Sequence, residues 1–203
     1  MTNCRQGILD FPSFDGRRIE ANFEGGDISS DGGVMLLHQA DRWLGLCGAL
    51  DRAIEDPRDP AMITHRQVDL LRQRIYGIAQ GYEDLNDHDN LRGDPLWQCA
   101  VERGDELASG PTLCRLEGRS DRCTALAMSR VFVGGFIDSF ALAPAELVLD
   151  FDATGDRVHG CQEGRFFHGY YGDWCCLPLY VFCGDRLLVS YLRPSNIDAA
   201  CHA

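Results

Sequence analysis

Two aspartates, Asp150 and Asp152, stand one residue apart in an apolar run that extends from Leu147 to Thr154. A β-strand sends alternate side chains to opposite faces, so both carboxylates point one way while Leu149 and Phe151 point the other. Burying unpaired carboxylates is costly. This face therefore either binds a hard divalent cation such as Mg²⁺ or Mn²⁺, or lies at a strand end where the carboxylates meet water.

The composition limits the classes of protein to which the chain can belong. With 203 residues, of which 45% are hydrophobic, the chain can form one sizeable core, or a core and a small helical domain. No apolar stretch reaches the length of a membrane span. The N-terminus lacks the basic start and apolar segment of a secretory signal, so we expect a cytoplasmic protein without membrane partners.

The charged residues and the cysteines further limit the kinds of protein and of site that the chain can form. All 19 basic residues are arginine, and the net charge of −12 argues against a free-standing nucleic-acid-binding protein. Ten cysteines occur without a C-x-x-C pair. A zinc ligand set drawn from Cys161, His168 and Cys175 is one alternative. The other, which we expect, is reduced thiols that serve as small core residues.

Turn residues and helical periodicity divide the chain into three parts. Residues 1–28 are predicted to form an extended arm, residues 29–143 an all-helical region that binds DNA if the protein is a DNA-binding one, and residues 144–203 a strand-rich region. The predicted helices cover Ser29 to about Leu46, Thr64 to Gly81, Asp94 to Val101, a segment from Ser109, and Cys123 to Phe140.

Several side chains in these regions carry two readings each. Arg66, Arg72 and Arg74 form the most basic helix face, which is either a solvated face or a phosphate-contacting one. Arg115 either contacts DNA or forms a surface salt bridge. Tyr170 and Tyr171 either stack on bases or pack beneath the sheet.

Three strands are predicted in the last region, over residues 147–154, 177–183 and 186–192. Gly184-Asp185 between the second and third strands is a tight hairpin signal, so we expect consecutive antiparallel pairing. The predicted fold class is therefore α+β. Three strands make a poor independent sheet, which predicts that the chain is an incomplete part of a larger fold.

Several segments together resemble the group 1 DDE-domain family of bacterial insertion-sequence transposases. The resemblance covers nearly the whole chain in order. It is carried by Gly81–Asp89, Ser109–Glu117, Leu149–Thr154, His159–Gly164, Gly169–Gly172, Leu177–Gly184 and Leu192–Pro194.

This resemblance implies helical DNA-binding segments followed by a ribonuclease H-like catalytic domain. The implied activity is cleavage and strand transfer of DNA at insertion-sequence ends by Mg²⁺ or Mn²⁺ ions held between three carboxylates. The family pattern matches best with Asp152 as the first catalytic and metal-binding carboxylate, with Asp150 as the fallback. The second Asp and the Glu are expected beyond the third strand, so we expect the chain to be truncated and inactive alone.

Two further functions compete with the transposase fragment. A shortened product that keeps DNA-end binding or homodimer formation would regulate transposition without cleaving DNA. A different metal-dependent phosphatase or nuclease would use Asp150 and Asp152 together, and would hydrolyse its substrate without any other chain.

Overall fold

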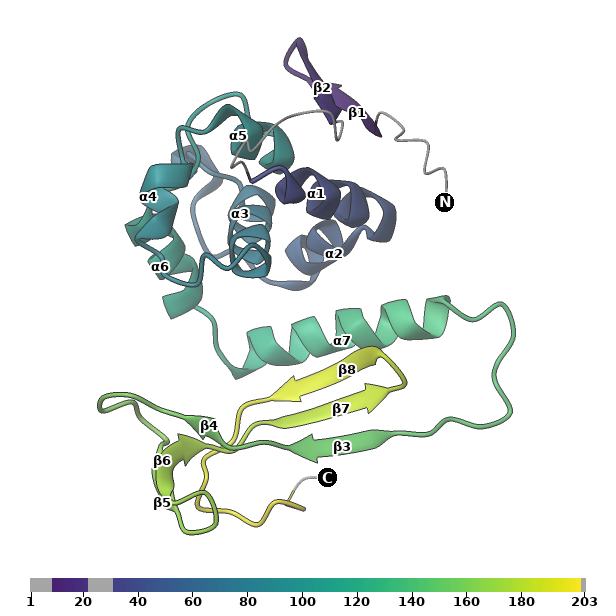
Figure 1. Ribbon diagram of the computed structural model, residues 1–203, viewed down its shortest axis with the longest axis vertical. Coiled ribbons are helices and arrows are strands. Elements are labelled where there is room, and N and C mark those ends of the chain that lie inside the picture. The colour runs from purple at the N-terminus through teal and green to yellow at the C-terminus, as the bar shows by residue number, and fades with distance from the viewer. Residues whose placement is uncertain (1–8, 22–30, 202–203) are drawn as a thin grey trace, which may run out of the picture. The chain divides into compact units, whose positions relative to one another are not determined.

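A computed structural model describes residues 9–21 and 31–201 of the chain (Figure 1). Contacts divide the chain into two compact units, Met1–Ser120 and Asp121–Ala203, which we call the N-terminal and the C-terminal unit and describe separately. The described residues form seven α-helices and three small antiparallel sheets, which confirms the predicted α+β class. Within these same residues, no helix is both long and apolar enough to cross a membrane.

A β-hairpin opens the described part of the N-terminal unit. Strands β1 (Leu9–Phe14) and β2 (Arg17–Ala21) pair across a turn at Asp15-Gly16, where both residues adopt positive φ angles. Phe11 and Ile19 face each other in this ladder and are buried in the helical core. The sequence predicted an extended arm over residues 1–28. Of that arm, residues 1–8 and 22–28 lie outside the described part.

Six α-helices and one 3-10 helix follow in the N-terminal unit, and they begin close to where the turn residues predicted. The first predicted helix, Ser29 to about Leu46, ends near Gly45, whose left-handed backbone ends α1 and begins α2, a helix that was not predicted. Asp94 caps α5 as predicted, because its side chain accepts hydrogen bonds from the N–H groups of Leu96 and Trp97. The elements are α1 (Gly33–Leu44), α2 (Leu46–Ala53), η1 (Pro60–Met62), α3 (Gln67–Ala79), α4 (Asp87–Leu91), α5 (Pro95–Val101) and α6 (Gly110–Gly118).

A buried tryptophan lies in the core of this unit. Trp97 on α5 has no exposed surface, and its indole N–H donates to Asp31 Oδ2 at 2.9 Å. The Tyr82 hydroxyl donates to the other oxygen of Asp31 at 2.8 Å, and the two rings meet edge to face at 6.0 Å. Asp31 therefore satisfies the polar ends of two core aromatic residues, which lets their rings pack against apolar neighbours.

A network of charged side chains joins helices α1, α3 and α5. Asp41 on α1 accepts hydrogen bonds from Arg72 Nε at 3.3 Å, the Tyr76 hydroxyl at 3.0 Å and the Cys47 N–H at 2.7 Å. Arg72 also donates to Glu102 Oε2 at 2.6 Å. The side chains of Asp41 and Arg72 are 6% and 14% exposed, so little water competes for these bonds.

Glu102 ends α5 in an unusual backbone conformation. Its φ angle is 64°, in the left-handed region that non-glycine residues seldom adopt. The turn directs its carboxylate toward Arg72 and toward Arg42 on α1, whose NH1 lies 3.4 Å from Oε1. The strained residue is thus also the carboxylate that completes the charged network.

The C-terminal unit pairs one helix with a three-stranded sheet. Helix α7 (Arg122–Asp138) packs on the β8 side of this sheet, and the Arg122 guanidinium lies over the Tyr191 ring at 5.7 Å (Figure 1). The sheet order is β3-β7-β8, with both neighbouring pairs antiparallel, as the sequence predicted. The strands are β3 (Asp150–Ala153), β7 (Leu179–Cys183) and β8 (Arg186–Tyr191).

The contacts thus group α7 with the strands that follow it. The functional division into an arm at 1–28, a DNA-binding region at 29–143 and a catalytic region at 144–203 stays a prediction. It groups residues by expected role and not by contacts.

A second small sheet in this unit was not predicted. Strands β4 (Asp156–Arg157), β5 (Phe166–His168) and β6 (Asp173–Cys176) pair in the antiparallel order β4-β6-β5. The sequence indicated a glycine-rich segment and a turn-rich link over this stretch. Short strands between glycines have too few residues for a period-2 pattern to be recognised.

Replacing Asp41 tests the charged network. We expect Asp41→Ala to lower the free energy of unfolding by about 3 kcal/mol, because it removes one partner of a buried ion pair. Urea denaturation of the whole chain measures this change. The control is Glu106→Ala, which breaks an exposed pair with Arg92 and should cost less than about 1 kcal/mol. Equal costs for the two variants would contradict a special role for the network.

Three histidines in the N-terminal unit are held in the neutral form by burial. The ring of His88 is fully buried, its Nε2 has no hydrogen-bond partner among the described residues, and burial lowers its pKa. The ring lies against Gly77 on α3, where an added Cβ would come within 2.5 Å of Cε1. Burial is also the main cause that lowers the pKa values of His38 and His65.

These lowered pKa values predict how stability depends on pH. At a pH below the ordinary histidine pKa of 6.5, the unfolded chain takes up protons that the folded chain does not. The free energy of unfolding therefore falls as the pH decreases below 6.5. It recovers as the pH rises above 6.5. Thermal unfolding at several pH values measures the slope. His38→Gln should reduce this slope, and a melting temperature that does not change with pH just below 6.5 would refute the prediction.

Candidate functional site

The two aspartates predicted as site residues lie together on β3. Asp150 pairs with Phe182 and Asp152 with Tyr180 of β7, so both carboxylates are on the same face of the strand. Both are exposed, and Phe151 between them is 48% exposed. The strand begins at Asp150 and not at Leu147 as predicted. Because the carboxylates meet water, no burial cost has to be offset by a cation.

The side chain of Asp152 is oriented by Thr154, two residues later in the chain. The Thr154 hydroxyl donates to Asp152 Oδ2 at 2.9 Å, and the Thr154 N–H donates to the Pro178 carbonyl at 3.2 Å. The second bond fixes the backbone at the end of the strand, and the first leaves Asp152 Oδ1 open to another ligand. Nothing comparable fixes Asp150 among the described residues.

An aromatic side chain covers the turn that follows these aspartates. The Tyr171 hydroxyl donates to the Ala153 carbonyl at 3.3 Å, and its ring fills the space where Gly155 lacks a side chain. Tyr171 thus packs against this turn while 43% of its surface stays exposed, a contact that tests neither packing beneath the sheet nor base stacking. Tyr170 is 87% exposed and contacts Tyr171 edge to face, so its side chain is free to meet another molecule.

The structure does not assemble a multi-ligand metal site from the residues that it describes. No group of three or more His, Cys, Asp or Glu side chains within 9–21 and 31–201 is arranged to hold an ion. The zinc alternative with Cys161, His168 and Cys175 is therefore wrong: Cys161 is exposed, whereas Cys175 is buried. The nine described cysteines are free thiols, and Cys47, Cys99, Cys175 and Cys176 serve as core residues.

The predicted basic face on α3 is neutralised by carboxylates. Arg66 pairs with Asp69, Arg72 with Asp41 and Glu102, and Arg74 with Glu117. These arginines are therefore not available to contact phosphate without breaking an ion pair. They act instead as ion-pair partners that join segments of the N-terminal unit.

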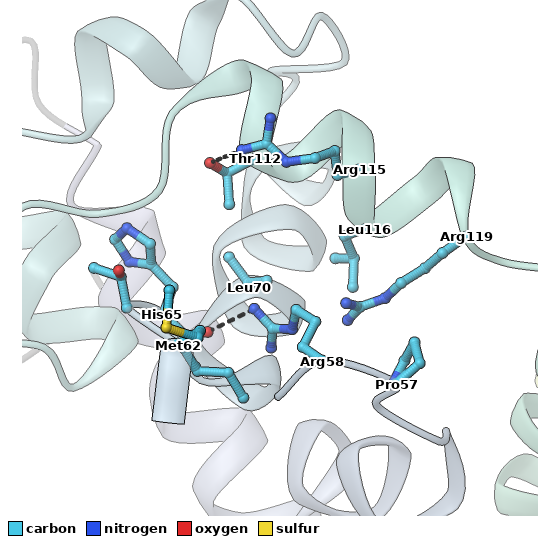
Figure 2. Close-up of a pocket in the computed structure, with 11 residues that line it drawn as sticks. Pro57, Arg58, Met62, His65, Leu70, Thr112, Arg115, Leu116 and Arg119 are labelled. Atoms are coloured by element: carbon cyan, nitrogen blue, oxygen red, sulfur yellow. Dashed lines mark hydrogen bonds between the residues drawn. The ribbon is translucent and has the colours of Figure 1, made fainter. Parts of the chain in front are cut away.

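Positive charge gathers instead at a pocket between α6 and the segment around η1. The pocket has a volume of about 430 Å³ and is lined by eleven residues (Figure 2). Three are arginines, one is histidine, two are threonines and five are apolar; none is Asp or Glu. Figure 2 shows Arg115 and Arg119 reaching the pocket from α6 and its end, and Arg58 from the segment before η1. The salt-bridge interpretation of Arg115 is not supported, because among the described residues its NH2 donates to the Thr112 hydroxyl at 3.0 Å and pairs with no carboxylate.

Two of these arginines share one carboxylate. Arg58 donates two hydrogen bonds to Asp56, at 2.8 and 2.6 Å, and a third to the His65 carbonyl at 2.9 Å. Arg119 NH1 lies 3.3 Å from Asp56, and its NH2 donates to Gln67 Oε1 at 2.8 Å. The hydrogen bonds from Arg58 lower the pKa of the Asp56 carboxyl, and burial lowers the pKa of Arg119, to which the positive charge of Arg58 adds.

The sequence reading missed Arg58, Arg119 and His65 as members of this pocket. The segment Asp56–Pro60 was interpreted as a break between helices, which it is. The signal available was the spacing of Arg115 and Arg119, which are four residues apart and so lie on one face of a helix. Nothing in the sequence connects that face with a segment more than fifty residues earlier.

Comparison with known proteins completes the description of the chain. No curated protein matches it, and no solved structure does. A family model described as transposase DDE domain group 1 matches residues 11–203, and so spans both units. The chain therefore belongs to the group 1 family of transposase DDE domains.

Proposed function

We propose that this chain acts in DNA transposition and contributes Asp152 as the first carboxylate of a metal-dependent site that cleaves and joins DNA. The observation that carries the proposal is the place of Asp152 within a match to the transposase DDE domain over residues 11–203. Asp152 lies on the first strand of its sheet and is oriented by Thr154. Asp150, two residues earlier on the same face, is the fallback for this role.

The strand arrangement supports a ribonuclease H-like fold for the region that contains Asp152. Three antiparallel strands that pair in the order β3-β7-β8, with the small second sheet inserted between β3 and β7, are compatible with one part of such a sheet. In the described residues β3 pairs on one side alone, so its other edge is available to a further strand.

The carboxylates on β3 fit a divalent cation in part. Mg²⁺ is commonly held by one or two carboxylates together with waters and substrate phosphates, and Asp152 Oδ1 can supply one such ligand, with Asp150 on the same face as the fallback. A bound ion would activate a water or a 3′ hydroxyl and neutralise charge on the attacked phosphodiester. Two ions need a third carboxylate, and the described residues bring none to this face. We therefore propose that the chain alone binds metal weakly and does not cleave DNA.

Thr154 acts as a positioning residue in this proposal. Its hydroxyl occupies Asp152 Oδ2 and so directs the opposite oxygen outward. Residues that orient a metal ligand in this way typically contribute 10- to 100-fold to metal affinity. The backbone bond from Thr154 to Pro178 keeps this hydroxyl in place beside the strand.

Metal binding by the whole chain tests these roles. We expect Mn²⁺, followed by electron paramagnetic resonance, to bind the unaltered protein. Asp152→Asn should abolish this binding, and Thr154→Val should weaken it by about tenfold through the lost orientation of Asp152. Asp138→Asn, an exposed carboxylate at the end of α7, is the matched control and should have no effect.

Three results would count against the proposal in different ways. Equal weakening by Asp150→Asn and Asp152→Asn would mean that the two carboxylates act as one ligand pair. Retained Mn²⁺ binding in Asp152→Asn would move the metal-binding role to Asp150. Mg²⁺-dependent hydrolysis of DNA or of a phosphate ester by this chain alone would favour the phosphatase or nuclease alternative.

A further inference from the structure

We infer that the pocket between α6 and the segment around η1 binds a backbone phosphate of DNA, with Arg115 as the residue that contacts it. This inference rests on the proposed function, since it assigns a surface of the N-terminal unit to the DNA on which a transposase acts. The pocket lies within residues 29–143, the region for which the sequence predicted DNA binding.

The charge of the pocket favours an anion in spite of the acidity of the chain. The whole protein has 31 acidic and 19 basic residues, yet three arginines and no carboxylate line this pocket. Asp56 lies behind the lining and is shared by Arg58 and Arg119. Asp51 adds a weaker attraction on Arg58. One shared carboxylate against three guanidinium groups leaves the pocket positive.

The three arginines differ in how firmly they are held. Arg58 and Arg119 are anchored by Asp56, by the His65 carbonyl and by Gln67, so their positions are set before any ligand arrives. Arg115 is exposed, and among the described residues it bonds to the Thr112 hydroxyl and to no carboxylate. A guanidinium group offers a planar pair of N–H donors that matches two phosphate oxygens. Arg115 can thus turn to a phosphate without breaking an ion pair.

The size and the apolar part of the pocket favour a nucleic acid over free phosphate. A volume of about 430 Å³ is within the range of ligand pockets and larger than a phosphate group needs. The apolar lining includes Leu70 and Leu116, which are buried, and Met62, which is 80% exposed. A deoxyribose attached to the phosphate can lie against the exposed Met62 side chain, whereas inorganic phosphate would leave it uncovered.

Several other arginines of the N-terminal unit are less suited to contact DNA phosphates than those of the pocket. Arg66, Arg72, Arg74 and Arg92 each pair with a carboxylate and so present little free charge to DNA. Phosphate contacts supply most of the affinity of a protein for DNA of any sequence. The pocket, by contrast, brings three arginines together on a concave surface that no carboxylate lines.

DNA binding by the full chain tests the inference with one matched pair of variants. Arg115→Gln removes a guanidinium from the pocket. Arg52→Gln removes another exposed one, on α2, that has no ion pair among the described residues and lies outside the lining. Fluorescence anisotropy with two unrelated short DNA duplexes over a range of salt concentrations gives the affinities. We expect Arg115→Gln to weaken binding of both duplexes about three- to tenfold and to lower the salt slope by about one.

The controls separate a pocket contact from general charge and from misfolding. Arg52→Gln should bind both duplexes like the unaltered chain, and both variants should keep its melting temperature. As a measurement that needs no variant, DNA should protect Arg115 from modification by phenylglyoxal more than it protects Arg52. Inorganic phosphate, followed by phosphorus NMR, is the probe for a small anion.

Each remaining outcome overturns the inference in a recognisable way. Equal weakening by the two variants would mean diffuse electrostatic attraction, and DNA binding unaffected by Arg115→Gln would place the contact elsewhere. Phosphate binding that depends on Arg115, without DNA binding by the unaltered chain, would make this a pocket for a small anion. None of these outcomes changes Mn²⁺ binding at Asp152, so the proposed catalytic role can stand or fail separately.

Discussion

The N-terminal unit depends on charges that it has largely removed from water. Arg72 on α3 reaches Asp41 on α1 and Glu102 at the end of α5, and it does so with 14% of its side chain exposed. A guanidinium in such a place is tolerated because each of its partners is fixed by further contacts. Asp41 also accepts hydrogen bonds from the Tyr76 hydroxyl and from the Cys47 N–H in the first turn of α2. The packing of α1, α3 and α5 therefore depends on these ion pairs, and the ion pairs in turn depend on how the three helices are placed.

The same pairing explains how an acidic chain can have an arginine-lined pocket. Most arginines of the N-terminal unit are used up in internal ion pairs, as Arg72 and Arg74 illustrate. Helical spacing predicted which of them share a face, but it could not predict the carboxylates that other helices bring to that face. Arg58 and Arg115 come together through the fold alone, since their separation in the sequence is 57 residues (115 − 58) and no periodicity spans it.

Local signals predicted most helices and the main sheet. Asp94-Pro95 and Ser109-Gly110-Pro111 predicted helix starts because capping and proline geometry act within one turn. Asp15-Gly16 is an equally local hairpin signal that was not recognised, and the hairpin is buried through Phe11 and Ile19. For the candidate site, the shared face of Asp150 and Asp152 followed from strand alternation. Their exposure did not, because it depends on what packs against β3.

Glu102 leaves the chain little freedom to change at one position. Its φ of 64° favours glycine, and asparagine or aspartate would also accept it. Glycine and asparagine would relieve the backbone but leave Asp41 as the one carboxylate partner of Arg72. Aspartate is one methylene shorter than glutamate, so its carboxylate would not reach Arg72 as that of Glu102 does at 2.6 Å. Each alternative improves the backbone at the expense of the ion pair. Among related sequences, substitutions at residue 102 should therefore be correlated with substitutions at residue 72.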